Sequence, residues 1–127
     1  MSRSAKVLLC DDSRLALMKL RKLFEGMGVE IVGAHQSGPE AIEAYKENRD
    51  QVDLVSLDLV MPGMDGLEVL AELKEFDPDV NVLILSSIVQ PEIEAQAREL
   101  GAAGVLEKPY DADRIQAVLD EILGAGA

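Results

Sequence analysis

The chain has 127 residues, with 24 acidic and 12 basic side chains, a formal net charge of −12 and one cysteine. This length fits a single domain, 1–127, and no apolar run approaches the ~18 residues of a membrane span, so a cytoplasmic location is expected. The negative charge argues against nucleic acid and anionic membranes as partners, because their phosphates would be repelled, and the lone Cys10 excludes an intrachain disulfide.

Short apolar runs predict five strands. The first, at 7–10, is too short for a helix and stops at four polar residues. Most of the runs are apolar throughout instead of alternating with polar residues, which is typical of a parallel sheet that is buried on both faces. The four later runs lie at 29–34, 52–57, 82–85 and 104–106.

Helical patterns fill the segments between the strands. Apolar residues recur at helical spacing over 17–27, and Ser37, Pro39 and Glu40 combine a cap, an early proline and a capping-box acid. The alternation of strands and helices predicts a doubly wound α/β domain with a five-stranded parallel sheet flanked by five helices. The remaining helices are expected over 67–76, 90–100 and 111–122, the last capped by Asp111.

Polar side chains follow the strands where each strand ends. In an open α/β sheet, ligands bind outside the carboxyl ends of the strands. Carboxylates that meet there repel one another, by about 4 kcal/mol for a pair ~4 Å apart at an effective dielectric of about 20. A hard divalent cation such as Mg²⁺ offsets that repulsion. The residues at the strand ends are Asp11, Asp12, Asp58, Ser86 and Lys108.

Asp58 is the centre of this candidate site, because it ends an apolar strand and enters a Pro/Gly loop at 61–66. A carboxylate beside a divalent cation, an ammonium group and a hydroxyl suits phosphoryl transfer, with the aspartate as nucleophile. Taken alone, Asp58 also suits a metal ligand or a catalytic base, and Asp11 and Asp12 suit the dipole of the following helix.

These residues together resemble the receiver domain of two-component response regulators, and in size and layout the single-domain chemotaxis-regulator type. The resemblance covers essentially the whole chain and rests on the acid pair, on Asp58 with its loop, on Ser86, and on Lys108 before Pro109. It implies a flavodoxin-like sheet of strand order 2-1-3-4-5. It also implies a phosphorylation-dependent signalling switch that is not an enzyme in the usual sense, but promotes its own phosphorylation and slow dephosphorylation.

The resemblance gives each of these residues a role. Asp58 is the phosphoacceptor, and Lys108 pairs with its phosphoryl group and precedes a cis bond to Pro109. Ser86 is the switch hydroxyl that moves toward the phosphoryl group. The implied Mg²⁺ ligands are Asp58, Asp12, Asp11 mainly through water, and the backbone carbonyl of Val60.

Two positions depart from the commoner pattern. Val105 stands where many receivers carry Tyr or Phe, so output is expected to rely on the loop at 86–91 and the helix after it. Val60 and Ile88 occupy the positions that usually tune hydrolysis, and neither side chain can hydrogen-bond an attacking water. We therefore expect a phosphoryl group that is slow to leave unaided.

The resemblance implies a histidine kinase or histidine phosphotransfer protein as phosphoryl donor, with Arg14, Lys19 and Arg21 as candidate contacts, and a downstream protein target. Homodimerisation is left open. A flavin-binding protein would need a Ser/Thr/Gly-rich phosphate loop where this chain has two acids. The alternative function is an aspartate-nucleophile phosphatase, although such enzymes typically place a second acid where this chain has Val60.

Overall fold

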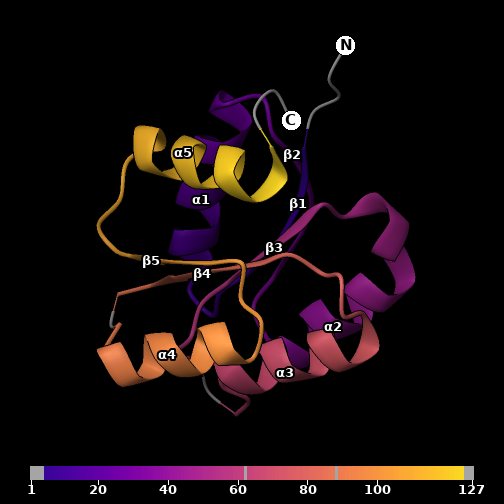
Figure 1. Ribbon diagram of the computed structural model, residues 1–127. Coiled ribbons are helices and arrows are strands. Elements are labelled where there is room, and N and C mark those ends of the chain that lie inside the picture. The colour runs from indigo at the N-terminus through magenta and orange to yellow at the C-terminus, as the bar shows by residue number, and fades with distance from the viewer. Residues whose placement is uncertain (1–4, 62, 88, 125–127) are drawn as a thin grey trace.

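The computed structural model describes residues 5–61, 63–87 and 89–124, which form one parallel sheet between two layers of helices (Figure 1). The strand order is β2-β1-β3-β4-β5 and each neighbouring pair is parallel, so the predicted fold class and order are confirmed. The elements are β1 Lys6–Cys10, α1 Arg14–Gly26, β2 Glu30–His35, α2 Gly38–Asn48, η1 Arg49–Gln51, β3 Leu54–Leu57, α3 Gly66–Phe76, β4 Val82–Ser86, α4 Pro91–Glu99, β5 Gly104–Glu107 and α5 Ala112–Leu123.

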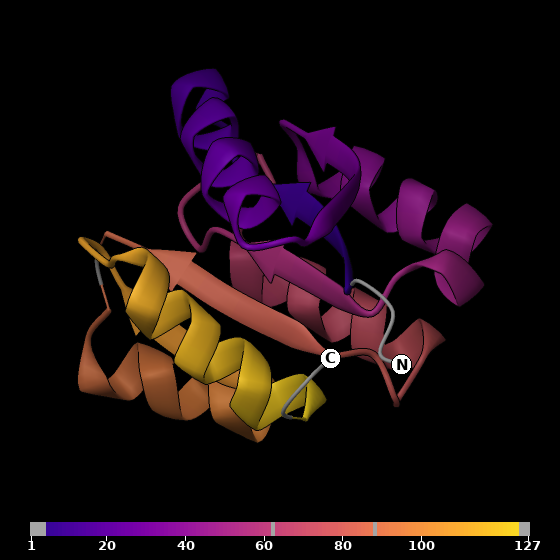
Figure 2. The same cartoon turned by 90° about the horizontal axis from the view of Figure 1, so that it is seen from above.

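The two faces of the sheet carry separate cores. Helices α1 and α5 cover one face, and α2, α3 and α4 cover the other (Figures 1 and 2). Along β1 the side chains alternate, with Val7 and Leu9 packed toward α1 and α5, and Leu8 and Cys10 toward α2 and α3. Because both faces are covered, the central strands are almost wholly apolar between their ends, and Ser56 of β3 is the buried exception.

Helix starts agree with their sequence signals. The Ser37 hydroxyl accepts a hydrogen bond from the Glu40 N–H at 3.3 Å, and the Asp111 carboxylate accepts one from the Arg114 N–H at 2.9 Å. Asp65 and Glu68 form a complete capping box at the start of α3. These caps satisfy N–H groups that have no partner within their helix.

Several elements begin or end a residue or more from their expected boundaries, β3 and α4 among them. The strand predicted over 52–57 begins at Leu54, because Arg49–Gln51 forms a 3-10 turn closed by a bond from the Val52 N–H to the Arg49 carbonyl at 3.3 Å. Helix α4 ends at Glu99, and Leu100 after it is 39% exposed. Among the described residues, no helix has the length and apolar character needed to cross a membrane.

Candidate functional site

The candidate site lies at the carboxyl ends of β1 and β3. Cys10 and Leu57 are partners in the parallel register, and the Asp58 N–H donates to the Cys10 carbonyl at 3.0 Å. Asp11 and Asp58 therefore leave adjacent strands at the same level. Carboxylate oxygens of Asp11, Asp12 and Asp58 all lie within 4.8 Å of one another, so the structure brings together the three acids that the sequence singled out.

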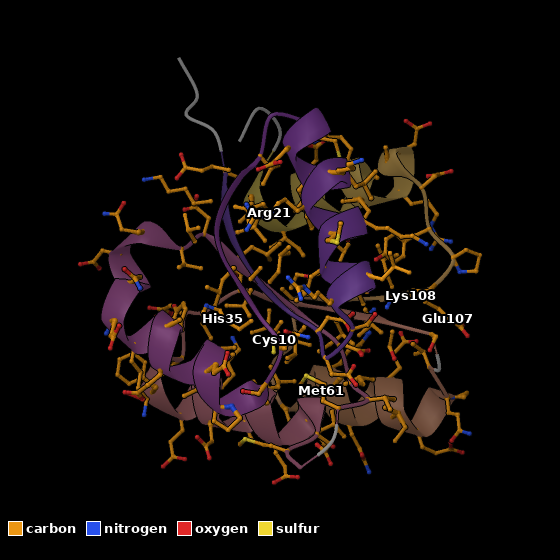
Figure 3. All side chains as sticks on the ribbon, turned by 180° about the vertical axis from the view of Figure 1, so that it is seen from behind. Cys10, Arg21, His35, Met61, Glu107 and Lys108 are labelled. Carbon is orange, nitrogen blue, oxygen red and sulfur yellow. The ribbon has the colours of Figure 1, made fainter. Side chains whose placement is uncertain are left out.

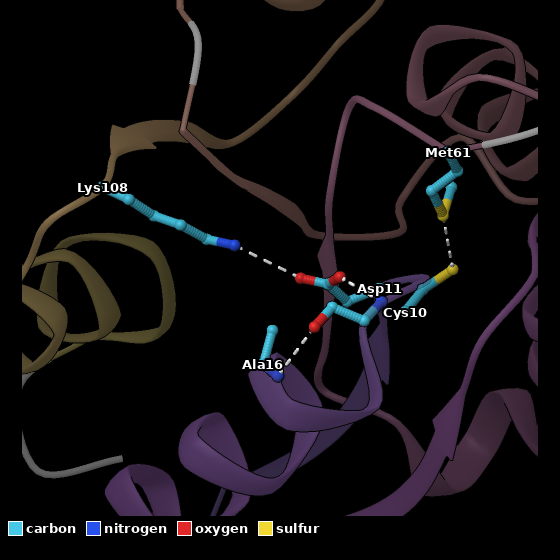
Figure 4. Close-up of polar contacts among 6 residues, drawn as sticks. Cys10, Asp11, Ala16, Met61 and Lys108 are labelled. Atoms are coloured by element: carbon cyan, nitrogen blue, oxygen red, sulfur yellow. Dashed lines mark hydrogen bonds and ion pairs between the residues drawn. The ribbon is translucent and has the colours of Figure 1, made fainter.

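Asp11 is already held by hydrogen bonds. It is only 2% exposed, and its Oδ1 accepts a bond from the Ser13 N–H at 2.8 Å. Its Oδ2 lies 3.3 Å from the Lys108 Nζ, which reaches across from the end of β5 (Figure 4). Asp12 is exposed, so its carboxylate remains accessible to solvent. Lys108 thus stands beside the acids, as expected, and its closest acidic partner is Asp11.

Asp58 lies in an environment that disfavours its charge. The side chain is buried, and that burial raises the pKa of the carboxyl above its usual value, as do the negative charges of Asp11 and, to a smaller extent, Asp12. The Lys108 ammonium and a hydrogen bond from the Val60 N–H lower the pKa, but the raising effects are larger. A cation bound between the acids would remove this penalty.

The loop after Asp58 is packed closely against the chain around it. A Cβ on Gly66 would lie 2.5 Å from the Asp58 carbonyl oxygen and 2.6 Å from the Leu59 Cα, so only glycine permits this approach. The Gly66 N–H donates to the Leu59 carbonyl at 2.9 Å. Val60, in this loop, is 58% exposed. Pro62, two residues after Val60 and part of the recognised loop motif, lies outside the described residues.

Ser86 and Val105 occupy the next two strands. Ser86 is fully buried at the end of β4, and its carbonyl accepts a bond from the Lys108 N–H at 2.8 Å. Val105 pairs with Ile84 in the register and packs against the core on the α4 side. The Lys108–Pro109 peptide bond is cis, as expected. Ile88, the second position expected to tune hydrolysis, lies outside the described residues.

The three basic residues of α1 do not form one cluster. Arg14, Lys19 and Arg21 are all exposed, but the spacing of 3.6 residues per turn puts Arg14 and Arg21 near one face and Lys19 on another. Arg21 pairs with Glu25 at 3.6 Å, and it lies along α1 well away from Lys108 in the view of Figure 3. Of the three, Lys19 lies in a groove of roughly 600 Å³ between α1 and the β5–α5 loop.

The sequence assigned no role at the site to two nearby residues, Tyr110 and Met61, although Met61 opens the recognised 61–66 loop. Tyr110 is half-buried in the α1 groove beside Lys108, and burial followed by the charges of Asp11 and Asp58 raises its pKa to about 12. Met61 is buried against Cys10, with 3.7 Å between Sδ and Sγ. Burial first, and then the nearby acids, raise the pKa of the Cys10 thiol to about 12, so it stays neutral. The sequence marked Cys10 as the last residue of the first predicted strand, next to Asp11, and marked Tyr110 only as the residue that follows Lys108-Pro109.

The donor set fits Mg²⁺. The described residues at the site offer carboxylate oxygens from three aspartates within 4.8 Å, and hard cations of this kind prefer oxygen ligands. The neutral Cys10 thiol faces Met61 and the Ser37 carbonyl, so sulfur takes no part in the acidic cluster. The raised pKa of Asp58 indicates that the existing positive charge from Lys108 does not fully compensate the acids.

Comparison with known proteins gives consistent matches along the chain. Residues 7–120 match the family model described as response regulator receiver domain. The chain is 38% identical to the chemotaxis protein CheY of Halobacterium salinarum over 94% of this chain and 98% of the relative, and 31% identical to CheY of Bacillus subtilis over 93% and 97%. It is similar in structure to the CheX-CheY-BeF3-Mg²⁺ complex from Borrelia burgdorferi, with a TM-score of 0.92, 28% identity, and coverage of 95% of this chain and 90% of that one.

Proposed function

We infer the function of this chain from the premise that it belongs to the response regulator receiver family, and is therefore a phosphorylation-dependent signalling switch. We propose that Asp58 accepts the phosphoryl group. The observation that carries this assignment is that the Asp58 carboxylate lies close to those of Asp11 and Asp12, and within reach of the Lys108 charge, at the end of a central strand. Asp11 is committed to Ser13 and Lys108, which leaves Asp58 as the buried carboxylate available to react.

The proposed step is an in-line displacement at phosphorus. A carboxylate oxygen of Asp58 forms the new O–P bond while the P–N bond of a phosphohistidine donor, or the P–O bond of acetyl phosphate, breaks and its electron pair leaves with the donor. Mg²⁺, held by Asp11, Asp12, Asp58 and the Val60 carbonyl, would supply positive charge at the phosphoryl oxygens. Lys108 would exchange its contact with Asp11 for a phosphoryl oxygen of the product.

Phosphorylation is proposed to change the surface formed by α4 and β5, on the side of β4 that lies away from β3. Ser86 would turn its hydroxyl toward the phosphoryl group, and the change would pass through Val105 and the loop before α4 to the α4–β5 surface. The buried position of Ser86 at the end of β4 and the packing of Val105 toward α4 support this route. The Borrelia burgdorferi structure, which holds CheX, BeF3 and Mg²⁺ with CheY, supports a protein partner that reads such a state.

The donor is proposed to be a histidine kinase or a histidine phosphotransfer protein that contacts Arg14, Lys19 and Arg21. Because Lys19 lies in the groove beside Lys108 and the other two do not, charge reversal at Lys19 should slow transfer more than reversal at Arg14 or Arg21. Transfer rates from the cognate kinase that are equal for Lys19→Glu and wild type would exclude this contact.

The lifetime of the phosphoryl group is proposed to be long. Val60 is exposed over the site, and its side chain cannot hydrogen-bond a water that attacks phosphorus. Replacement by Glu, as in Val60→Glu, should therefore shorten the lifetime, measured as decay of acetyl-phosphate-labelled protein. A half-life of seconds for the wild-type protein would contradict the proposal.

The test of the whole assignment uses Mg²⁺ with beryllofluoride or acetyl phosphate. Backbone NMR shifts should change around Asp58, Ser86 and Val105, and Asp58→Asn should abolish the covalent label. The family and the relatives named above do not support the phosphatase alternative. Continuous turnover of a soluble phosphomonoester would nevertheless favour it over a switch.

A further inference from the structure

Cys10 and Met61 make a contact that the proposed chemistry does not use. Both side chains are buried, and the Cys10 Sγ lies 3.7 Å from the Met61 Sδ and 3.6 Å from the Ser37 carbonyl. The contact therefore joins the end of β1, the cap of α2 and the loop after β3. Figure 4 shows the sulfur atoms of Cys10 and Met61 facing each other beside Asp11.

The segment 58–61 is attached to Cys10 at both of its ends. At one end the Asp58 N–H donates to the Cys10 carbonyl at 3.0 Å, and at the other end the Met61 side chain packs on the Cys10 thiol. Between these two attachments Val60 is 58% exposed, while Leu59 and Met61 are each 7% exposed. The four residues 58–61 thus form a short arch over Cys10, and Val60 is the most exposed residue of the arch.

The oxygens proposed to hold Mg²⁺ come from the two sides of this contact. Asp11 and Asp12 follow Cys10 directly, and Val60 directly precedes Met61. The Cys10–Met61 contact therefore joins the segment that carries the acid pair to the segment that carries the Val60 carbonyl. Outer contacts of this kind orient metal ligands without touching the metal.

We propose that Cys10 and Met61 are a positioning pair for the metal site, which fixes the 58–61 arch against the end of β1 and thereby sets the Mg²⁺ affinity. The inference rests on the proposed function, because it assumes that Mg²⁺ binds at the acids. It adds that the two sulfur side chains act on binding through Val60 and Asp11, and that their effect on binding is separate from their share in the stability of the core.

The test measures Mg²⁺ affinity by isothermal titration calorimetry, together with thermal unfolding in EDTA. Met61→Ala should weaken Mg²⁺ binding about tenfold, the usual size for loss of an outer contact. Met61→Leu keeps the side-chain volume and should restore the affinity to within about threefold. Leu73→Ala is the matched control, because Leu73 is buried in the same core and is distant in sequence from every proposed ligand.

Each outcome decides the proposal. Met61→Ala with wild-type affinity, or Leu73→Ala with an equal loss, would overturn it. If Met61→Ala does not fold, Met61→Val and Cys10→Ala decide instead: a loss of several-fold supports the positioning role, and wild-type affinity in both refutes it. Absence of Mg²⁺ binding by the wild-type protein would contradict the proposed function itself, and is distinguished from the other outcomes by the wild-type titration.

Discussion

Asp58 and Asp77 are both buried aspartates, 8% and 7% exposed, yet their surroundings have opposite effects on the carboxylate. The Asp58 carbonyl lies close to Gly66 at the start of α3, and Asp77 caps the other end of this helix of 11 residues, which is about 16 Å long. Burial and two neighbouring acids raise the pKa of Asp58, whereas a hydrogen bond from Tyr45 is the main reason that the pKa of Asp77 is lowered.

The difference lies in the number of donors that each acid receives. Asp77 accepts bonds from the Tyr45 hydroxyl at 2.7 Å and the Asp79 N–H at 3.1 Å, and the Arg49 Nε lies 3.4 Å away. Asp58 accepts from the Val60 N–H and faces two like charges. A buried acid whose hydrogen bonds are satisfied stabilises the fold, whereas one that lacks donors favours the binding of a cation or a phosphoryl group.

The largest expected effect comes from exchanging each acid for its amide. Asp58→Asn should abolish labelling by acetyl phosphate, and should stabilise the metal-free protein by about 1–3 kcal/mol because one of three crowded charges is removed. Asp77→Asn should keep the label and lower the free energy of unfolding. Label incorporation and urea unfolding in EDTA measure both effects. If Asp77→Asn also stabilised the protein, the surroundings of Asp58 and Asp77 would not have opposite effects on the carboxylate.

The hydrogen bond from Tyr45 should contribute most of the stability at the Asp77 end. Tyr45→Phe should lower the free energy of unfolding by about 1–3 kcal/mol, because it leaves a buried carboxylate without its strongest donor. Tyr110→Phe is the matched control, since no hydrogen bond joins the Tyr110 hydroxyl to any residue that the structure describes. Urea unfolding at pH 7 makes the comparison. An equal loss in both variants would refute the role of the Asp77 bond.

The two acids should also give opposite pH dependences. The folded pKa of Asp77 lies below its ordinary value of 3.8, so its stabilising effect is present above pH 3.8 and is lost as the pH falls through the folded pKa. The raised pKa of Asp58 destabilises the metal-free protein at neutral pH, and that penalty is relieved as the pH falls through its folded pKa.

Unfolding free energies measured in EDTA test this difference in sign. The series runs from neutral pH down to about pH 3 and so crosses the ordinary pKa range of carboxyl groups. The advantage of Asp58→Asn over wild type should shrink already on mild acidification. The deficit of Tyr45→Phe should persist until the pH falls below 3.8, the ordinary value for Asp77. If the deficit of Tyr45→Phe and the advantage of Asp58→Asn disappeared over the same pH range, the assigned pKa directions would be contradicted.

The comparison also shows what could be predicted from the sequence. The strand ends were predictable, because apolar runs that stop at polar residues fix both the sheet and the edge where Asp11, Asp58 and Lys108 meet. The Asp77 network was not predictable. From the sequence, Asp77 is only the residue that follows the helix predicted over 67–76, and its partners Tyr45 and Arg49 come from α2 and the unpredicted 3-10 turn.

Within the site, too, some features could be predicted from the sequence and others could not. The sequence placed Lys108 near the acids, but only the fold shows that its ammonium pairs with Asp11, a contact between residues 97 positions apart. Cys10 ended a predicted strand and Met61 opened the 61–66 loop, and their contact depends on how the 58–61 arch closes over β1. Local patterns therefore predicted the elements and the residue types of the site, whereas contacts between distant segments required the structure.

The smallest expected effect is at Arg49. Its contact with Asp77 is longer than that of Tyr45, 3.4 Å against 2.7 Å, and the Arg49 side chain is 53% exposed, so water and salt screen it. Arg49→Ala should therefore lower the free energy of unfolding by less than about 1 kcal/mol, including the loss of its stacking on Phe76. The difference from wild type should shrink further in 1 M salt, where the Debye length is about 3 Å. A loss as large as that of Tyr45→Phe would mean that positive charge, and not the buried hydroxyl donor, keeps Asp77 ionised.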